Sequence, residues 1–194
     1  MKKKLPLPGK NGLSSRYLFA GILTIIIAAS FFTVYFVVFH KDKDAASRAQ
    51  QDGHQSLRIR NYEQAIQAYS RAIRNDPDDS SARYNRGTAY LNYRKYDNAI
   101  SDFNEAIRRN SSNPTYYLNR GNAYFHSGNY EMAVKDFSKV FEASPGNQIA
   151  VYNRGRAYYH WGKWDDALRD FQKAYSLGNK GAKQLIEEIN KRRK

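Results

Sequence analysis

The sequence repeats itself at a fixed period. The stretch YNRGTAY at 84–90 recurs as LNRGNAY at 118–124 and as YNRGRAY at 152–158, so Gly87, Gly121 and Gly155 are equally spaced. The same step backward from Gly87 reaches Gly53, so four units follow one another. A period in this range is typical of solenoids, in which each unit covers the apolar face of its neighbour. This constraint governs the interpretation of most of the chain.

Small and aromatic residues occupy separate positions of the repeat. When the units are numbered from Ala46, Ser80, Pro114 and Gln148, position 8 is always Gly and position 20 always Ala, whereas positions 17 and 24 are always aromatic. The spacing of apolar residues within positions 4 to 11 and 17 to 27 predicts two amphipathic helices in each unit. Small side chains let these helices approach closely, and the rings fill the space beside them. Each unit is therefore predicted to be a helical hairpin.

This pattern resembles the tetratricopeptide repeat, a helix–turn–helix of the same period with Gly at position 8, Ala at 20, an aromatic residue at 24 and Pro near 32. The resemblance covers roughly residues 46–179, although the family's Trp at position 4 is absent and Pro at position 32 remains only as Pro77 and Pro145. It implies a protein-binding solenoid with no chemistry of its own. The predicted boundaries are repeats at 46–79, 80–113, 114–147 and 148–181, then a capping helix and basic tail at 182–194.

Arg at position 7 and Asp at position 23 occur together. The pairs are Arg86 with Asp102, Arg120 with Asp136, and Arg154 with Asp170. The first unit has Asp52 and Ala68 at these positions, so the two residues also disappear together. This favours an Arg–Asp bridge between packed helices. A row of anion-binding Arg side chains is the alternative, because Arg suits carboxylates and phosphates.

The resemblance also implies a concave groove lined by the first helix of each repeat. The predicted protein-binding residues are Tyr84, Asn85, Thr88, Leu91, Asn92, Leu118, Asn119, Asn122, Phe125, His126, Tyr152, Asn153, Arg156, Tyr159 and His160. Amides can pair with both groups of an extended backbone, and rings supply contact area at low entropic cost. The recurring Asn at position 6 has no equally regular partner within the sequence. We therefore expect the groove to bind an extended protein segment; the alternative is that Asn merely solvates an exposed face.

The chaperone-binding branch of the family grips C-terminal carboxylates with Lys and Arg at set groove positions. Those positions here hold Gln50, His54, Thr115 and Asn119 or, counted from the second repeat, Tyr84, Thr88, Ile149 and Asn153. Binding through that clamp is not expected.

His126 and His160 share position 13 of adjacent repeats, which raises the question of a metal site or an acid–base pair. Equivalent positions on packed helices lie about 10 Å apart, and no Cys or carboxylate is in register to complete a coordination shell. No nucleophile stands in a recognisable setting, and the sequence has no Gly-rich phosphate loop. We therefore expect no metal, no cofactor and no enzymatic activity.

The N-terminal part contains an apolar stretch, residues 17–39, that carries no charge. Such a stretch is long enough to cross a bilayer. A cleaved signal peptide is the alternative, but the apolar run continues beyond the small residues at 28–30. The interpretation is a transmembrane signal anchor at 17–39 and a linker at 40–45. The positive-inside rule would place a basic tail, 1–16, in the cytoplasm and the repeats outside, in the periplasm of a bacterium with two membranes.

Residues 41–194 carry 27 Lys and Arg against 18 Asp and Glu. The basic residues are scattered among acidic ones apart from KRRK at 191–194, which argues against nucleic acid as a partner. The sequence thus predicts an all-α chain: a single transmembrane helix, an α-solenoid of four repeats and a capping helix. The predicted function is a scaffold in the inner membrane that aids assembly or secretion at the cell envelope, with extended protein segments or subunits of membrane complexes as partners. Two alternatives remain: a holdase-like chaperone for exported chains, and a fixed structural subunit of a membrane complex.

Overall fold

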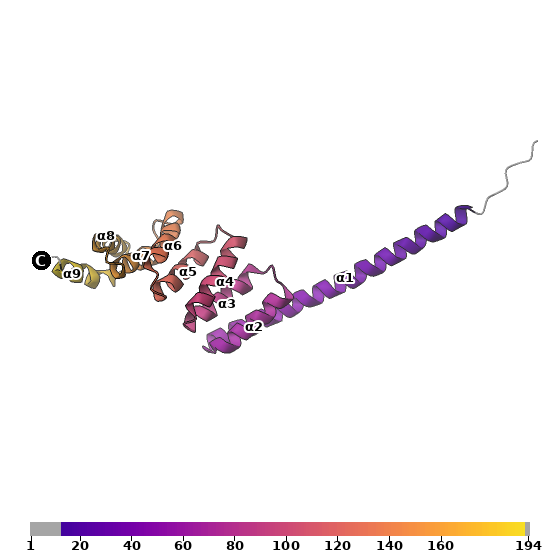
Figure 1. Ribbon diagram of the computed structural model, residues 1–194, viewed down its shortest axis with the longest axis horizontal. Helices are drawn as coiled ribbons and strands as arrows, with labels where there is room; N and C mark the ends of the chain where they lie inside the picture. Colours follow the sequence, from indigo (N-terminus) through magenta and orange to yellow (C-terminus); the bar gives the residue numbers. More distant parts are fainter. Residues whose placement is uncertain (1–12, 193–194) are drawn as a thin grey trace, which may run out of the picture. The chain divides into compact units, whose positions relative to one another are not determined.

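The computed structural model describes residues 13–192, which form nine α-helices (Figure 1). The helices are α1 (Leu13–Arg58), α2 (Tyr62–Asn75), α3 (Ser80–Asn92), α4 (Tyr96–Arg109), α5 (Pro114–His126), α6 (Tyr130–Ala143), α7 (Gln148–His160), α8 (Trp164–Ser176) and α9 (Ala182–Arg192). The chain divides into two units, 1–44 and 45–194, and α1 contributes residues to both. Within the second unit α3 packs on α4, α5 on α6, α7 on α8, and each pair on the next. The prediction of an all-α solenoid is confirmed.

The first helices of repeats 2 to 4 begin where a polar side chain caps them. Asp79, Asn113 and Asn147 precede α3, α5 and α7, and their side-chain oxygens accept hydrogen bonds from backbone N–H groups of the first turn at 2.8 to 3.1 Å. These bonds satisfy donors that have no partner inside the helix. The cap residue recurs at the same position of successive repeats, so the helix starts keep the period of the sequence.

Glycine at position 8 marks the closest approach of the two helices in a repeat. A Cβ atom added to Gly121 would lie 2.7 Å from the ring of Phe137, and one added to Gly53 would lie 2.6 Å from the ring of Tyr69. The position-24 rings are fully buried in all four repeats. The small residue and the ring therefore form one packing unit, as their separate positions in the sequence predict.

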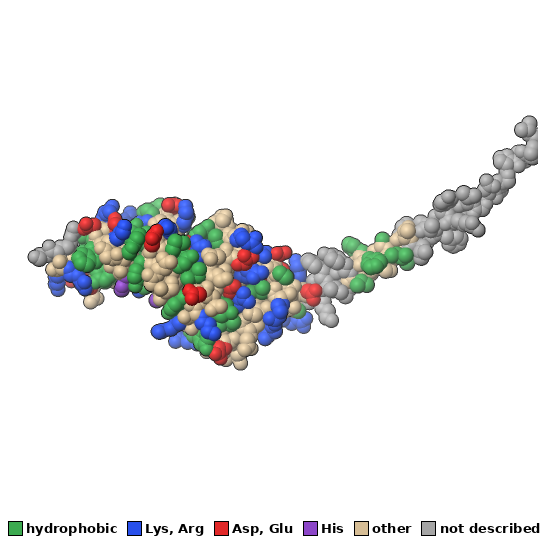
Figure 2. Space-filling view, viewed as in Figure 1, with side chains coloured by type: hydrophobic (Ala, Val, Ile, Leu, Met, Phe, Trp, Pro, Cys, Tyr) green, Lys and Arg blue, Asp and Glu red, His purple; other side chains and the backbone are tan. Residues whose placement is uncertain are grey.

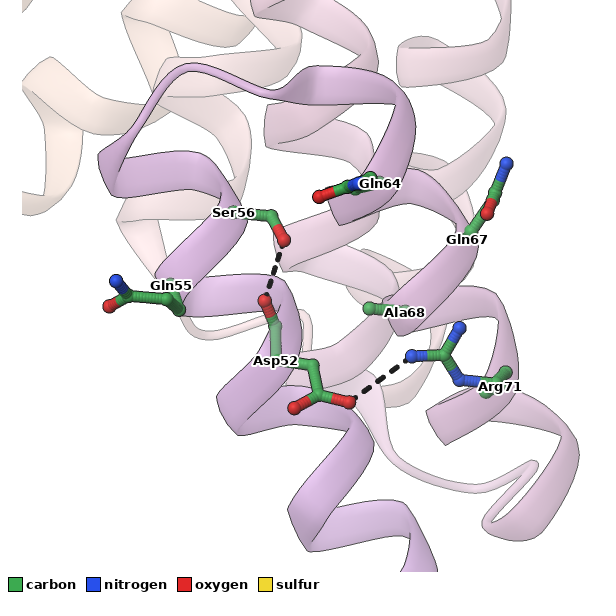
Figure 3. Close-up of a pocket in the computed structure, with 7 residues that line it drawn as sticks. All are labelled: Asp52, Gln55, Ser56, Gln64, Gln67, Ala68 and Arg71. Atoms are coloured by element: carbon green, nitrogen blue, oxygen red, sulfur yellow. Dashed lines mark hydrogen bonds and ion pairs between the residues drawn. The ribbon is translucent and has the colours of Figure 1, made fainter.

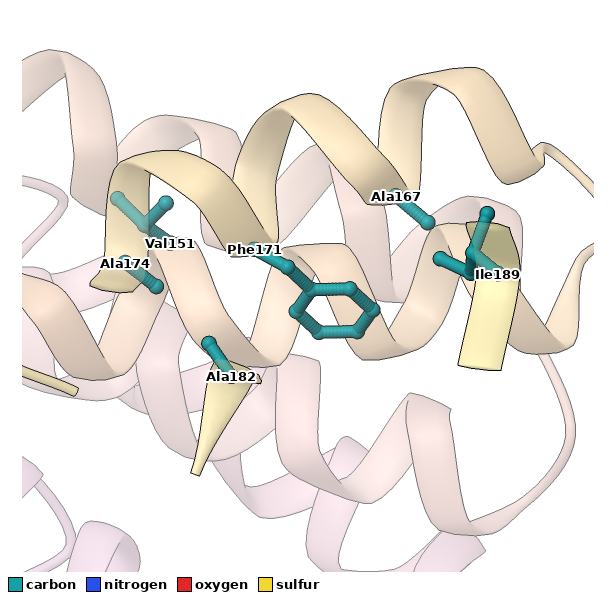
Figure 4. Packing of buried hydrophobic residues seen from close by; sticks show 6 residues of the cluster. All are labelled: Val151, Ala167, Phe171, Ala174, Ala182 and Ile189. Atoms are coloured by element: carbon teal, nitrogen blue, oxygen red, sulfur yellow. The ribbon is translucent and has the colours of Figure 1, made fainter. Parts of the chain in front are cut away.

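The last helix covers the end of the solenoid. Ala182 and Ile189 of α9 are buried in a cluster with Val151, Phe171 and Ala174 of repeat 4 (Figure 4). The apolar face that a fifth repeat would cover is thereby removed from water. Residues 193–194 of the predicted basic tail lie outside the described residues.

The predicted Arg–Asp bridges are confirmed in repeats 2 to 4. In repeat 3, Nε and Nη2 of Arg120 donate to the two carboxylate oxygens of Asp136 at 2.8 and 2.7 Å. The third nitrogen, Nη1, donates to Oδ1 of Asn104 in the preceding repeat at 2.6 Å. Arg86 and Arg154 make the same set of contacts, with Ser70 and Ser138 in the place of the Asn. One guanidinium thus ties together three helices of two repeats, and the bonded carboxylate raises its pKa.

Repeat 1 has a polar cavity where its siblings have this bridge. Asp52 and Ala68 line the cavity, which measures about 410 Å³, and the Asp52 carboxylate turns to Arg71 instead (Figure 3). The distance from Arg71 Nη2 to Asp52 Oδ2 is 3.2 Å, and the two side chains are 48% and 65% exposed. Repeat 1 therefore keeps the hairpin but replaces a buried bidentate pair with an exposed single contact.

The N-terminal segment corrects the predicted localisation. Within the described part of the chain, no helix has both the length and the apolar character that a bilayer crossing requires. The apolar stretch is not a separate element, because α1 continues past it through Lys43, Asp44 and Arg48 and ends as the first helix of repeat 1. The prediction of a single-pass protein of the inner membrane with repeats facing outward is therefore wrong, and the role in envelope assembly or secretion loses the support it drew from that anchor. Residues 1–12, and the side chains of 13–23, 25 and 35–41, lie outside the described residues.

Candidate protein-binding groove

A cavity of about 440 Å³ opens between the first helices of repeats 2, 3 and 4. It is lined by Leu91, Asn92, Arg94, Tyr96, Asn122, His126, Asn153 and Arg156. These residues come from the end of α3, the turn after it, the start of α4, the middle and end of α5, and the middle of α7. The repeat period brings them together, because α3, α5 and α7 follow one another along the same face of the solenoid.

The Asn residues at position 6 link neighbouring repeats. Nδ2 of Asn119 donates to the Tyr84 hydroxyl at 2.7 Å, and Nδ2 of Asn153 donates to Oδ1 of Asn122 at 3.2 Å. Nδ2 of Asn85 lies 3.0 Å from Nε2 of His54. Each amide thus contacts the preceding repeat, but the partner is a His, a Tyr and an Asn in turn, so it is not regular as the Arg–Asp pairing is. Among the described residues, however, their Oδ1 atoms accept no hydrogen bond, so half of each amide remains available.

His126 and His160 stack on tyrosines of the repeat before them. The rings of His126 and Tyr96 lie 5.7 Å apart with 16° between their planes, and those of His160 and Tyr130 lie 5.6 Å apart with 23°. Burial lowers the pKa of His126, and the charges of Arg156 and Arg94 lower it further. His126 is therefore held in its neutral form near neutral pH, and its ring serves as packing between repeats. Across the described residues, no group of three or more His, Cys, Asp or Glu is placed to hold a metal ion.

Two arginines give the cavity its charge. Arg94 occupies the left-handed region, with φ 62°, directly after α3, at the position where repeats 3 and 4 have Gly128 and Gly162. Arg156 extends over the ring of Phe125, with 4.4 Å from its guanidinium carbon to the ring centroid. Within the part of the chain that the structure describes, no Asp or Glu lines the cavity. On the face shown in Figure 2, basic and acidic side chains are interspersed over the repeats.

The structure brings six of the predicted binding residues together around the cavity: Leu91, Asn92, Asn122, His126, Asn153 and Arg156. The others do not line it: Tyr84, Asn85, Thr88, Leu118, Asn119, Phe125, Tyr152, Tyr159 and His160. Several of these pack between helices instead. Tyr152 and Tyr159 lie against the cluster that α9 closes, and the Tyr159 hydroxyl donates to Glu188 at 2.6 Å.

Sequence reasoning missed Arg94 and Tyr96 as lining residues. Both lie beyond the first helix of their repeat, at positions 15 and 17, whereas groove residues were predicted on that helix alone. Position 17 carried a usable signal, because its aromatic character recurs in every repeat. Position 15 is Arg in two repeats and Gly in two, which is typical of a residue in the left-handed region rather than of a binding site.

The tetratricopeptide repeat model matches three overlapping ranges, 53–114, 87–147 and 118–182. Together these ranges cover well over half of the 194 residues. The chain belongs to the tetratricopeptide repeat family. Its fold is that of a protein-interaction scaffold. No curated protein matches the sequence.

Solved structures agree with this assignment. MamA 41-end from Desulfovibrio magneticus RS-1 superposes with a TM-score of 0.74 at 22% identity, over 77% of this chain and 86% of that one. The first repeat domain of Spaghetti (RPAP3), bound to the HSP90 peptide SRMEEVD, superposes with a TM-score of 0.59 at 28% identity, over 62% of this chain and 95% of that one. The second repeat domain of human RPAP3, in complex with the HSP70 peptide SGPTIEEVD, superposes with a TM-score of 0.56 at 29% identity, over 61% of this chain and 97% of that one. The likeness to MamA, at this identity, concerns the fold alone.

Proposed function

We propose that the groove along α3, α5 and α7 binds an extended segment of another protein. The observation that carries this proposal is the row of half-used amides: Asn85, Asn119 and Asn153 each bond the preceding repeat through Nδ2 and leave Oδ1 without a partner among the described residues. Acceptors spaced along a groove suit the backbone N–H groups of an extended chain. The cavity beside them supplies a place for one side chain of that segment.

The two RPAP3 domains support the proposal from outside this chain, because both are solved with a peptide of a partner protein. They do not identify the partner here. Binding by the carboxylate clamp would need Lys and Arg at groove positions that hold Tyr84, Thr88 and other uncharged residues in this sequence. The proposal therefore concerns the mode of binding, an extended segment along the amide row, and not chaperone tails.

Replacing all three amides tests the proposal. A random library of N-acetylated, C-amidated octapeptides serves as the probe, and the peptides that the full chain retains are then measured individually by fluorescence anisotropy. We expect the Asn85→Ala, Asn119→Ala, Asn153→Ala triple variant to bind these peptides at least tenfold more weakly, because each lost hydrogen bond is worth about 1 kcal/mol. Its free energy of unfolding should also fall modestly, since each amide links two repeats.

The matched control removes three exposed amides on helices that do not form the groove, Asn98 of α4, Gln172 of α8 and Gln184 of α9, by the same change to Ala. Peptide affinity should be unchanged in this variant. If the groove variant remains folded by circular dichroism and binds the peptides as tightly as the control, the amide row is not the binding surface. If the full chain retains no peptide from the library, the groove function itself is rejected.

A further inference from the structure

We propose that the cavity of the groove holds the acidic side chain, Asp or Glu, of the bound segment between Arg94 and Arg156. This inference rests on the proposed function and specifies the chemistry of the partner. It requires that the segment pass over the cavity with a carboxylate turned inward.

The charge of the cavity is uncompensated. Arg94 and Arg156 both line it, and no carboxylate of the described residues does. Neither the Arg94 nor the Arg156 guanidinium makes an ion pair with any described residue. Their situation differs from that of the position-7 arginines, which each hold an Asp with two hydrogen bonds. A partner that brings a carboxylate would supply what the cavity lacks, and Arg binds carboxylates with paired, charge-assisted hydrogen bonds.

The two arginines reach the cavity from fixed supports. Arg94 projects from a turn whose left-handed backbone is set by the end of α3. Arg156 is on the third turn of α7, and its guanidinium lies over the Phe125 ring, which holds a cation in place by its negative face. The side chains come from repeats 2 and 4, with His126 of repeat 3 between them along the chain. A carboxylate at this place would contact two repeats that do not follow one another in sequence.

Both charges act on the imidazole of His126. Arg156 and Arg94 each lower its pKa, which places the two guanidinium groups within electrostatic reach of one ring. The remaining lining residues are amides and apolar groups: Asn92, Asn122, Asn153, Leu91 and Tyr96. Amide N–H groups can bond a carboxylate as well, so they reinforce the preference for an anion.

An internal acidic side chain fits the place better than a chain terminus. Asn85 and Asn119, which belong to the proposed backbone contacts, do not line the cavity, so the amide row continues beyond it toward repeat 1. On the other side α7 continues past Arg156 to His160, whose ring stacks on Tyr130. A segment that uses the whole row would cross the cavity rather than end in it.

The test uses four pools of N-acetylated, C-amidated octapeptides that differ only at one central position, fixed as Glu, Gln, Lys or Ala. Affinity for the full chain is measured by competition with a labelled member of the retained library. We expect the Glu pool to bind about tenfold more tightly than the Gln pool, as for a charge-assisted pair at a partly solvated site. The preference should disappear in the Arg94→Gln, Arg156→Gln double variant.

Arg60→Gln is the matched control. Arg60 stands at the same turn position of repeat 1 with φ 59°, is exposed, and does not line the cavity. This variant should keep the full preference for Glu. A free C-terminal carboxylate on the Gln pool, in place of the amide, should not restore tight binding; if it does, the cavity takes a chain terminus and the inference is overturned.

The outcomes separate the inference from the function it rests on. Equal binding of the Glu and Gln pools, with affinity still lost in the Asn triple variant, overturns the acidic subsite and leaves the groove function standing. A Glu preference that survives in the Arg double variant also overturns the inference. If a poly(dT) oligonucleotide competes more strongly than the Glu pool, Arg94 and Arg156 recognise phosphate rather than a carboxylate, and the inference is overturned. Failure of every pool to bind rejects groove and subsite together.

Discussion

Repeat 1 and repeats 2 to 4 share one backbone arrangement but hold it by different means. Repeats 2 to 4 each bury an Arg–Asp pair that joins their two helices and the repeat before them, whereas repeat 1 has an exposed contact from Asp52 to Arg71. Repeats 2 to 4 bury Phe at position 24, whereas repeat 1 buries Tyr69. The Tyr69 hydroxyl has no hydrogen-bond partner in the described structure, and burial raises its pKa to about 12.

The contrast between repeat 1 and repeats 2 to 4 distinguishes the residues that a single hairpin needs from those that join successive repeats. Gly at position 8, Ala at position 20 and a ring at position 24 occur in all four repeats, so the hairpin depends on them. The Arg at position 7 also bonds the repeat before it. Among the described residues, only α1 itself lies N-terminal to repeat 1, so an Arg there would have no such contact to make. The bridge is thus a device for joining repeats as much as for closing one.

The largest effect should come from breaking a buried bridge. Asp136→Ala leaves the guanidinium of Arg120 without its carboxylate, and the two side chains are only 16% and 4% exposed, so the free energy of unfolding should fall by about 3 kcal/mol. Asp52→Ala in repeat 1 removes an exposed pair and should cost less than about 0.5 kcal/mol. Urea denaturation of the full chain, followed by circular dichroism, measures both. Equal losses would mean that repeat 1 and repeat 3 are stabilised alike.

The next effect concerns the feature that all repeats share. Gly53→Ala and Gly121→Ala should each cost about 2 kcal/mol, because the new methyl group would meet a buried ring at 2.6 or 2.7 Å and the ring must move. Gly146→Ala is the control, since no atom lies within 4 Å of the added group and the backbone is not in the left-handed region. Thermal denaturation compares the three variants. A Gly53 variant as stable as the control would show that repeat 1 is packed more loosely than repeat 3.

A smaller effect, of opposite sign, should come from making repeat 1 more like the others. Tyr69→Phe removes a buried hydroxyl that has no partner among the described residues, so the free energy of unfolding should rise by about 1 kcal/mol. The reverse change in repeat 3, Phe137→Tyr, should destabilise the chain by a similar amount or more. Both are measured by the same urea denaturation. A loss of stability in Tyr69→Phe would indicate that the hydroxyl is bonded, for example through a buried water molecule.

The sequence predicts the solenoid well because packing imposes the period. Gly121 faces Phe137 and Arg120 pairs with Asp136 within one repeat, so both relations recur at the same spacing and can be found by counting. The groove is harder to predict, because a position in the repeat does not say how its side chain is used. Asn119 and Tyr84 bond one another, and Tyr159 is held by α9, so residues of the predicted groove serve the stack. Arg94 reaches the cavity from a turn, which no helical spacing reveals.

The N-terminal stretch shows a different limit. Its apolar composition predicts a membrane helix when residues 17–39 are considered alone, whereas the structure continues the helix through charged residues into repeat 1. The hydrophobicity of a sequence window does not reveal whether the window and the segment after it belong to one continuous helix. The transition between them contains no Gly or Pro, which was the available sign that the helix does not end there.

The smallest effect concerns pH and again separates the repeats at position 13, where repeat 1 has an exposed Arg58 and repeat 3 has His126. The folded chain lowers the pKa of His126 from its ordinary value of 6.5 through burial and through Arg156 and Arg94. Protonation therefore favours the unfolded chain. The stability that neutral His126 contributes is fully present above about pH 6.5, and it is lost as the pH falls through the lower pKa of the folded chain.

The variant His126→Asn, which copies Asn92 of repeat 2, should remove this part of the pH dependence of stability. Denaturation at a series of pH values from 7.5 downward measures it, with the imidazole titrated by NMR in the folded chain. An imidazole that titrates at or above 6.5 would contradict the lowering by burial and by the two arginine charges together, and would remove one support for the acidic subsite.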